Sequence, residues 1–155
     1  MEISIMENTR YKVLFIEDNQ LDQMAFKRFV SENDIPYDCI IAGSVSEALQ
    51  ALDSNQFDIV ITDHELGDGT AFEILKSVKN IPVIVVTGAG DEDTAIRAWK
   101  DGAYDYLIKD LDQNYLKAIT ITVENAIKHK MVEKKLQLLS GAVMSTDDSV
   151  YIANI

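Results

Sequence analysis

Five short apolar runs are spread along the chain, and each has the length and composition of a β-strand. They cover residues 11–16, 37–42, 57–63, 81–86 and 104–108. The third run is typical: Ile59, Val60 and Ile61 are consecutive and β-branched, without the alternation of a half-exposed strand. This pattern predicts strands that are buried on both faces, as in the middle of a parallel sheet.

Between these runs, apolar residues recur at helical spacing and predict four amphipathic helices. Their expected apolar faces are Leu21, Met24, Ala25 and Phe29; Val45, Ala48, Leu49 and Leu52; Phe72, Leu75 and Val78; and Ala95, Ile96, Ala98 and Trp99. Strands that alternate with helices imply right-handed crossovers and a parallel sheet covered on both sides. We therefore expect an α/β fold with a doubly wound, five-stranded parallel sheet of flavodoxin-like order 2-1-3-4-5.

Side chains that could bind a metal or take part in a reaction follow four of the five predicted strands. Glu17 and Asp18 come after the first strand, Asp63 ends the third, Thr87 follows the fourth and Lys109 follows the fifth. Open α/β sheets bind ligands at the carboxyl ends of their strands, and the order 2-1-3-4-5 places the first and third strands side by side. The acids should therefore meet in one crevice.

Carboxylates that lie this close together need a positive charge to offset their repulsion. Two of them about 5 Å apart repel by roughly 3 kcal/mol at an effective dielectric of 20, and Lys109 balances only one. The excess either raises a carboxyl pKa or recruits a hard cation, for which Mg²⁺ fits best. Mg²⁺ and Lys109 would neutralise charge on a phosphoryl group while Asp63 attacks it, with the Thr87 hydroxyl nearby. We interpret Asp63 as a phosphoryl acceptor.

Composition narrows the class of protein. The chain has 155 residues, 47% of them hydrophobic and 26% charged, which suits one globular domain and a short appendage. No apolar run approaches the length of a membrane span, so we expect a soluble, cytoplasmic protein without membrane insertion. A net charge of −12 argues against direct nucleic-acid binding, and partners should be cationic, metal-bearing or protein. The single cysteine, Cys39, excludes an internal disulfide.

From Lys12 to Ile127, these residues together resemble the receiver domain of response regulators in two-component signal transduction. The resemblance implies that Asp63 is the phosphoacceptor and that Thr87 and Lys109 bind the phosphoryl group. It also implies that Asp18 and Glu17 hold Mg²⁺ together with Asp63 and the backbone carbonyl of Glu65, and that Tyr106 is the aromatic residue that switches with Thr87.

By the same resemblance, the phosphoryl donor is a histidine kinase or a phosphotransfer protein. The chain would be a signalling switch that catalyses its own phosphorylation and dephosphorylation, not an enzyme acting on other substrates. It departs from the family pattern at three positions: Asp110 stands where a proline usually follows the lysine, Gly67 where proline is common, and Ala71 where glycine is common.

The segment after residue 112 predicts one long helix, because no glycine or proline interrupts it before Gly141. About 28 helical residues span roughly 42 Å, more than the sheet can cover, so the end should project. Val132, Leu136, Leu139 and Val143 form an apolar seam there. The projecting part is either a homodimerisation helix or a solvated linker.

We expect four segments: an irregular N-terminus (1–10), a receiver domain (11–127), a helical linker and coiled-coil stub (128–141) and the start of a following domain (142–155). That last segment has a turn-like Ser145–Asp148 and a strand-like Val150–Ile152, and it weakly resembles the entry to a PAS domain. The chain would then belong to a longer signalling protein with a downstream domain, and a histidine kinase could lie further on.

Two other functions remain open from the sequence. An unphosphorylated receiver-like module for docking or dimerisation is one, motivated by Asp110. The other is a Mg²⁺-dependent aspartyl phosphatase of the haloacid-dehalogenase type, which also uses an aspartate at a strand end. That class needs a second aspartate two residues later, where this chain has Glu65.

Overall fold

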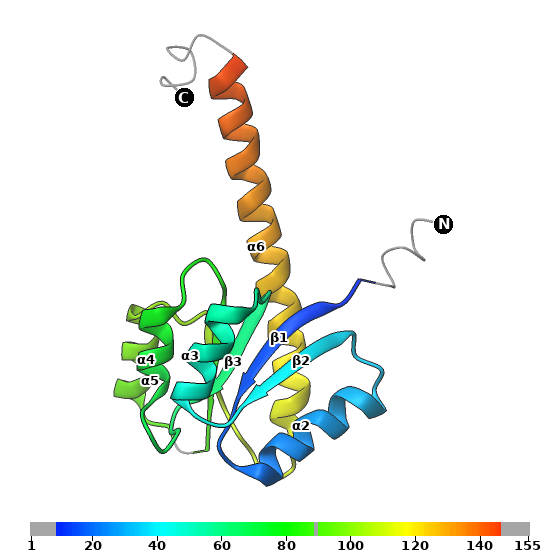
Figure 1. Ribbon diagram of the computed structural model, residues 1–155, viewed down its shortest axis with the longest axis vertical. Helices are drawn as coiled ribbons and strands as arrows, with labels where there is room; N and C mark the ends of the chain where they lie inside the picture. The colour runs from blue at the N-terminus through cyan, green and yellow to red at the C-terminus, as the bar shows by residue number, and fades with distance from the viewer. Residues whose placement is uncertain (1–8, 89, 147–155) are drawn as a thin grey trace.

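A five-stranded parallel sheet forms the centre of the protein, as the sequence predicts (Figure 1). The computed structural model describes residues 9–88 and 90–146. The strands are β1 (Tyr11–Ile16), β2 (Tyr37–Ala42), β3 (Ile59–Asp63), β4 (Val83–Thr87) and β5 (Asp105–Ile108), and the helices are α2 (Gln20–Glu32), α3 (Val45–Ser54), α4 (Ala71–Ser77), α5 (Glu92–Lys100) and α6 (Asn114–Thr146). The strand order β2-β1-β3-β4-β5 confirms the predicted order.

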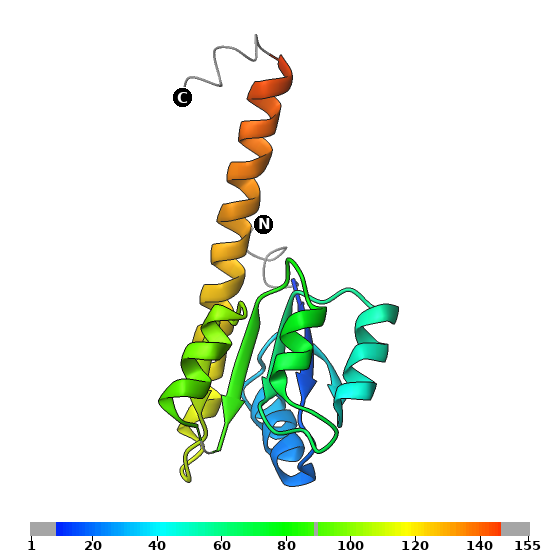
Figure 2. The same ribbon diagram turned by 90° about the vertical axis from the view of Figure 1, so that its left-hand side faces the viewer.

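The two faces of the sheet bury separate apolar layers. Because side chains alternate along a strand, Val13 and Phe15 of β1 face one layer, and Leu14 and Ile16 face the other. Helices α2 and α6 cover the first layer, and α3, α4 and α5 cover the second (Figure 2). Two-sided burial explains why the strands read as continuous apolar runs.

The predicted apolar face of helix α2 is right at Phe29, which packs against the core, but wrong at Leu21 and Met24. Leu21 and Met24 are 76% and 54% exposed, whereas Phe26 is 1% exposed and stacks on Phe15 of β1 with ring centroids 4.0 Å apart. The helix carries two apolar stripes, and periodicity alone does not distinguish them. Asn19 caps the helix by accepting the Asp22 backbone N–H, which sets where the helix begins.

The predicted inward face of α5 is also wrong at two positions. Ile96 and Trp99 are 40% and 54% exposed, and only Ala98 is fully buried. The helix packs against β5, the last strand of the sheet, where a narrow stripe of small residues is enough to cover the edge. The bulky apolar residues of α5 therefore face outward.

Helix α6 is longer than predicted. It begins at Asn114, packs on the sheet with residues such as Ile119 and Val123, and then continues past the body of the domain (Figures 1 and 2). The helix passes Gly141 and reaches Thr146, so the turn expected at Ser145 and Thr146 is wrong. A glycine costs only about 1 kcal/mol in a helix and does not have to end it.

Some expectations lie outside the described residues. These are the irregular conformation of residues 1–8 and the strand-like run at 150–152. Within the part of the chain that is described, none of the helices has the length and apolar character that crossing a lipid bilayer requires.

Candidate functional site

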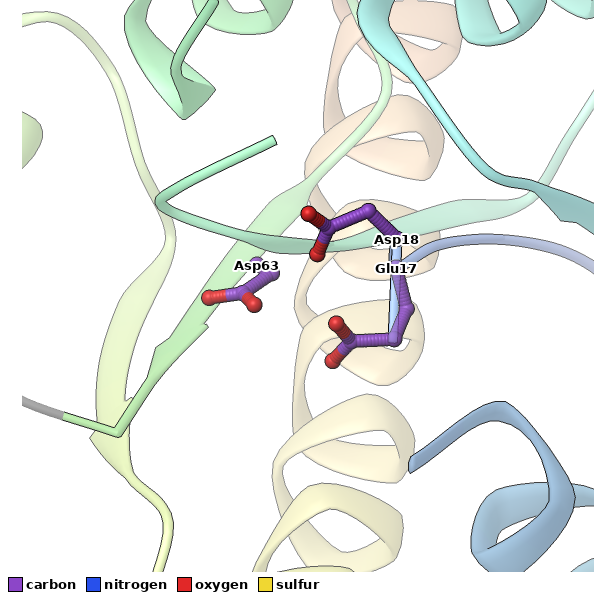
Figure 3. Close-up of side chains that lie close together, drawn as sticks. All are labelled: Glu17, Asp18 and Asp63. Carbon is purple, nitrogen blue, oxygen red and sulfur yellow. The ribbon is translucent and has the colours of Figure 1, made fainter. Parts of the chain in front are cut away.

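Glu17, Asp18 and Asp63 meet at the carboxyl edge of the sheet. Ile16 of β1 pairs with Thr62 of β3, so Glu17 and Asp63 leave the sheet side by side. One carboxylate oxygen from each of the three acids lies within 4.8 Å of the others (Figure 3). The parallel register thus produces the convergence that strand order predicts.

Glu17 is the buried member of the three acids. It is 1% exposed, and its oxygens accept hydrogen bonds from the Lys109 ammonium at 2.6 Å and the Asn19 backbone N–H at 3.1 Å. Burial raises the pKa of Glu17 to about 7, and the charge of Asp63 adds to the rise, although the hydrogen bonds from Lys109 and Asn19 oppose it. Glu17 is therefore a carboxyl whose ionisation depends on nearby cations.

Lys109 supplies the positive charge of the cluster. Its Nζ lies 2.6 Å from Glu17 Oε1, 2.9 Å from Asp22 Oδ2 and 3.3 Å from Asp63 Oδ2. Burial opposes the charged form of Lys109, but the hydrogen bonds to Glu17 and Asp22 outweigh it and raise the pKa of the amine. One ammonium thus faces four carboxylates in this crevice when Asp18 is included.

Asp22 is the functional candidate that sequence reasoning missed. It occupies the first turn of α2, where an acidic residue is common because it interacts favourably with the helix dipole. The helix dipole alone would explain an acid at this position. Asp22 also accepts a hydrogen bond from Lys109, which lies 87 residues later in the chain. The sequence contains no local signal that joins the two.

Thr87 and Tyr106 lie on β4 and β5, the last two strands of the sheet. Asp63 pairs with Val86 of β4, which places Thr87 one residue beyond it at the same edge, and Thr87 is 2% exposed. The Thr87 carbonyl accepts the Lys109 backbone N–H at 2.8 Å. Tyr106 points under the loop before α5, so close to Gly90 that a Cβ there would overlap its hydroxyl.

The loop after β3 is held by backbone and side-chain bonds. A β-bridge joins Glu65 to Thr70, and Asp68 accepts the N–H groups of Val45 and Ser46 at 2.9 and 3.1 Å, at the start of α3. The Glu65 side chain is exposed. Gly67, where the family often has proline, has a φ of 76°. The substitution of proline by glycine removes no polar group from the cluster.

Asp110 performs a structural task at the position where the family usually has proline. Its side chain accepts the Tyr115 backbone N–H at 3.1 Å, in the first turn of α6, and its carbonyl accepts the Gln113 N–H at 3.2 Å. The Lys109 ammonium nevertheless reaches Glu17 and Asp63. The departure at Asp110 leaves the lysine in the crevice.

The acidic cluster suits a small divalent cation. Mg²⁺ binds oxygen at about 2.0–2.1 Å, so two of its ligands are at most about 4.2 Å apart. The oxygens of Glu17, Asp18 and Asp63, within 4.8 Å of one another, reach that spacing with movements below about 1 Å. Burial and the charge of Asp63 raise the pKa of Glu17, and a cation there would counter both by stabilising its charged form.

Comparisons with known proteins define the class. A family model for the response regulator receiver domain matches residues 13–121, and the chain belongs to this family. It is 30% identical over 117 residues to regulatory protein LuxO of Vibrio cholerae, covering 73% of this chain and 25% of that protein. It is 31% identical over 141 residues to the two-component response regulator ORR21 of Oryza sativa, covering 88% of this chain and 20% of that protein.

Solved structures agree with this assignment. A response regulator receiver domain protein from Clostridium thermocellum is 33% identical, with a TM-score of 0.69 and coverage of 79% of this chain and 98% of that one. The receiver domain of a LuxO repressor protein from Vibrio parahaemolyticus is 26% identical, with a TM-score of 0.69 and coverage of 81% and 98%. The family and the fold expected from the sequence are confirmed, and the chain is a receiver domain, a class of signalling domain. It spans about a quarter of the length of LuxO.

Proposed function

We propose that this chain is a phosphorylation-dependent switch in which Asp63 accepts a phosphoryl group from the phosphohistidine of a histidine kinase or phosphotransfer protein. The observation that supports the proposal best is the ammonium of Lys109 at 3.3 Å from Asp63, inside the cluster of Glu17 and Asp18. A carboxylate oxygen of Asp63 would attack phosphorus and form an acyl phosphate. The phosphorus–nitrogen bond would break, and imidazole would leave with its electron pair.

The surrounding residues would stabilise the negative charge that develops on the phosphoryl group during this transfer. Glu17, Asp18, Asp63 and the carbonyl of Glu65 would hold Mg²⁺, which supplies charge neutralisation at the phosphoryl oxygens when bound. Lys109 would donate to one phosphoryl oxygen and the Thr87 hydroxyl to another. Fixed donors aimed at the developing charge are the largest catalytic contribution in such reactions.

The signal would leave the phosphorylation site through Thr87 and Tyr106. A phosphoryl group on Asp63 would draw the Thr87 hydroxyl toward it, and this movement would change the space available to the Tyr106 ring beneath the loop before α5. The face formed by α5, β5 and α6 would then differ between the two states. The hydroxyl of Tyr106 is buried and has no hydrogen-bond partner among the described residues, so the ring is held by packing.

Helix α6 would connect the receiver unit to two further partners, a downstream domain and a second copy of the chain. We propose residues 11–127 as the receiver unit and the projecting part of α6 as a linker to a downstream domain in a longer chain. Relatives several times as long as this chain support that arrangement. A second copy of the chain is a further partner, since the structure of a related receiver domain, that of NtrC4, is described as a dimer.

One experiment tests the phosphoacceptor. The chain is incubated with Mg²⁺ and phosphoramidate or acetyl phosphate, and intact mass and peptide mapping follow. We expect one added phosphoryl group on Asp63, none in Asp63→Asn, and a normal yield in the control Asp53→Asn, whose exposed aspartate lies on α3. EDTA should abolish the addition.

The same experiment distinguishes the alternatives. No mass gain in the wild type, with Asp63→Asn behaving identically in every assay, would contradict the switch and favour an unphosphorylated docking module. Continuous release of many phosphate equivalents from a small phosphate ester would instead favour an aspartyl phosphatase.

A further inference from the structure

Among the described residues, Asp22 is the only acid bonded to the Lys109 ammonium that the proposed metal and phosphoryl chemistry does not use. Its Oδ2 lies 2.9 Å from Lys109 Nζ, shorter than the 3.3 Å between that nitrogen and Asp63 Oδ2. The Asp22 side chain is 32% exposed, and its backbone N–H is bound by Asn19, the N-cap of α2. The carboxylate is therefore presented to the lysine from a fixed first turn.

The three partners of Lys109 differ in what happens to them during phosphorylation. An ammonium has three N–H donors, and in this structure Glu17, Asp22 and Asp63 accept from it. Glu17 and Asp63 belong to the group that can hold a cation, whereas Asp22 does not. A metal would compete with Lys109 for Glu17, and phosphorylation would convert the Asp63 carboxylate into an acyl phosphate. Asp22 alone of the three stays unchanged.

We propose that Asp22 is a positioning residue that anchors the ammonium of Lys109 throughout the phosphorylation cycle. This inference rests on the proposed function of Asp63 and adds a residue to it. Asp22 holds one N–H while a second turns to the incoming phosphoryl oxygen. Without this anchor, the four-carbon side chain of Lys109 keeps only Glu17, whose oxygens are shared with the cation.

The anchor raises the rate because a donor that is already oriented does not have to be ordered in the transition state. Removal of a single hydrogen bond of this kind corresponds to a rate loss of about three- to tenfold.

The test compares Asp22→Ala and Asp22→Asn with the wild type at saturating Mg²⁺ and phosphoramidate. We expect Asp22→Ala to lower the maximal rate of phosphoryl addition by about three- to tenfold. The maximal rate of Asp22→Asn should lie between those of the wild type and Asp22→Ala, because the side-chain oxygen of asparagine still accepts a hydrogen bond. The matched control is Asp93→Ala, which removes an exposed aspartate from the first turn of α5 and should react like the wild type.

A second measurement detects the anchor without any phosphoryl transfer. The ¹H–¹⁵N signal of the Lys109 ammonium, assigned with Lys109→Arg, should be visible in the wild type and in Asp93→Ala because its protons are held, and lost or broadened in Asp22→Ala. An unchanged signal together with an unchanged rate in Asp22→Ala would overturn the inference, as would equal rate losses in Asp22→Ala and Asp93→Ala. If the wild type takes up no phosphoryl group, the proposed function fails, and the ammonium signal alone decides the role of Asp22.

Discussion

At the scale of single residues, the crevice is dominated by an imbalance of charge. Lys109 contacts three carboxylates, and Asp18 adds a fourth acid to the same crevice. The excess of negative charge is lowered in part because the raised pKa of Glu17 favours its neutral, protonated form. Both the stability of the protein and its affinity for a cation should therefore respond to pH and to the loss of Lys109.

The first prediction concerns pH and Glu17. The pKa of this carboxyl is about 7 in the folded protein and 4.5 for an unperturbed glutamate, so the folded state binds more protons between these values. Stability from this group should therefore fall as pH rises from about 4.5 to about 7, by up to about 3 kcal/mol. Urea unfolding in EDTA at several pH values should show this fall in the wild type but not in Glu17→Gln.

The groups that face Glu17 explain why Mg²⁺ should change this behaviour. Asp63 disfavours its charge and Lys109 favours it, and a bound cation would favour it further. Adding Mg²⁺ should thus flatten the pH dependence of the wild type. Glu32→Gln, an exposed position on α2, is the control that should keep the wild-type slope. Parallel pH curves for the wild type and Glu17→Gln would contradict the assignment.

The second prediction concerns Lys109. Lys109→Met keeps most of the length of the side chain and removes its charge, which should affect two measurements in opposite directions. The rate of phosphoryl addition should fall at least about tenfold because a donor to the phosphoryl group is lost. Mg²⁺ affinity should rise severalfold because a competing cation has gone. Isothermal titration measures the affinity, with the exposed Lys100→Met as control; weaker Mg²⁺ binding in Lys109→Met would refute this view.

At the scale of elements, the sequence predicted the strands better than the helix faces. A strand buried on both sides, such as β3, is apolar throughout and needs no choice of face. Helix α2 requires a choice, because Leu21 and Met24 offer one apolar stripe and Phe26 and Phe29 another, and only the second packs. The five site residues at the ends of four strands could be predicted because parallel topology brings those ends together. Asp22 could not, since its partner is known only once the fold brings the first turn of α2 and Lys109, the residue after β5, to the same crevice.

The third prediction concerns the loop between β4 and α5. A Cβ at Gly90 would overlap the Tyr106 hydroxyl and lie 2.9 Å from its Cε1. Gly90→Ala should therefore push the ring outward. Burial raises the pKa of Tyr106, and the charge of Asp91 adds to the rise; the pKa should consequently fall toward its ordinary value of 10 in this variant. NMR titration of ¹³C-labelled tyrosine, assigned with Tyr106→Phe, measures it.

The same loop contains a matched control for this substitution. Nothing lies within 4 Å of a Cβ at Gly88, so Gly88→Ala adds the same methyl group without contact. Its Tyr106 titration should remain that of the wild type. Equal titration curves for Gly88→Ala and Gly90→Ala would show that the contact at Gly90 does not hold the ring.

At the scale of the whole molecule, the long helix α6 leaves the body of the domain (Figure 1). Helix α6 is packed on the sheet as far as Ile127 and then projects with Val132, Leu136 and Leu139 at 59%, 62% and 55% exposure. Their spacing of four and three residues forms one stripe. A stripe of this kind on a projecting helix is stable in water when a second helix covers it.

The last prediction is that two copies of the chain pair along this stripe. In a parallel arrangement, Lys128 and Glu133 flank the stripe at positions where opposite charges of the two helices meet. Sedimentation equilibrium should show a concentration-dependent dimer for the wild type. Leu136→Glu places a charge on the stripe and should give a monomer, whereas Leu138→Glu, at a residue 65% exposed beside the stripe, should stay dimeric. If both variants sediment like the wild type, the exposed stripe is not the contact, and the projecting part of α6 acts as a single linker helix.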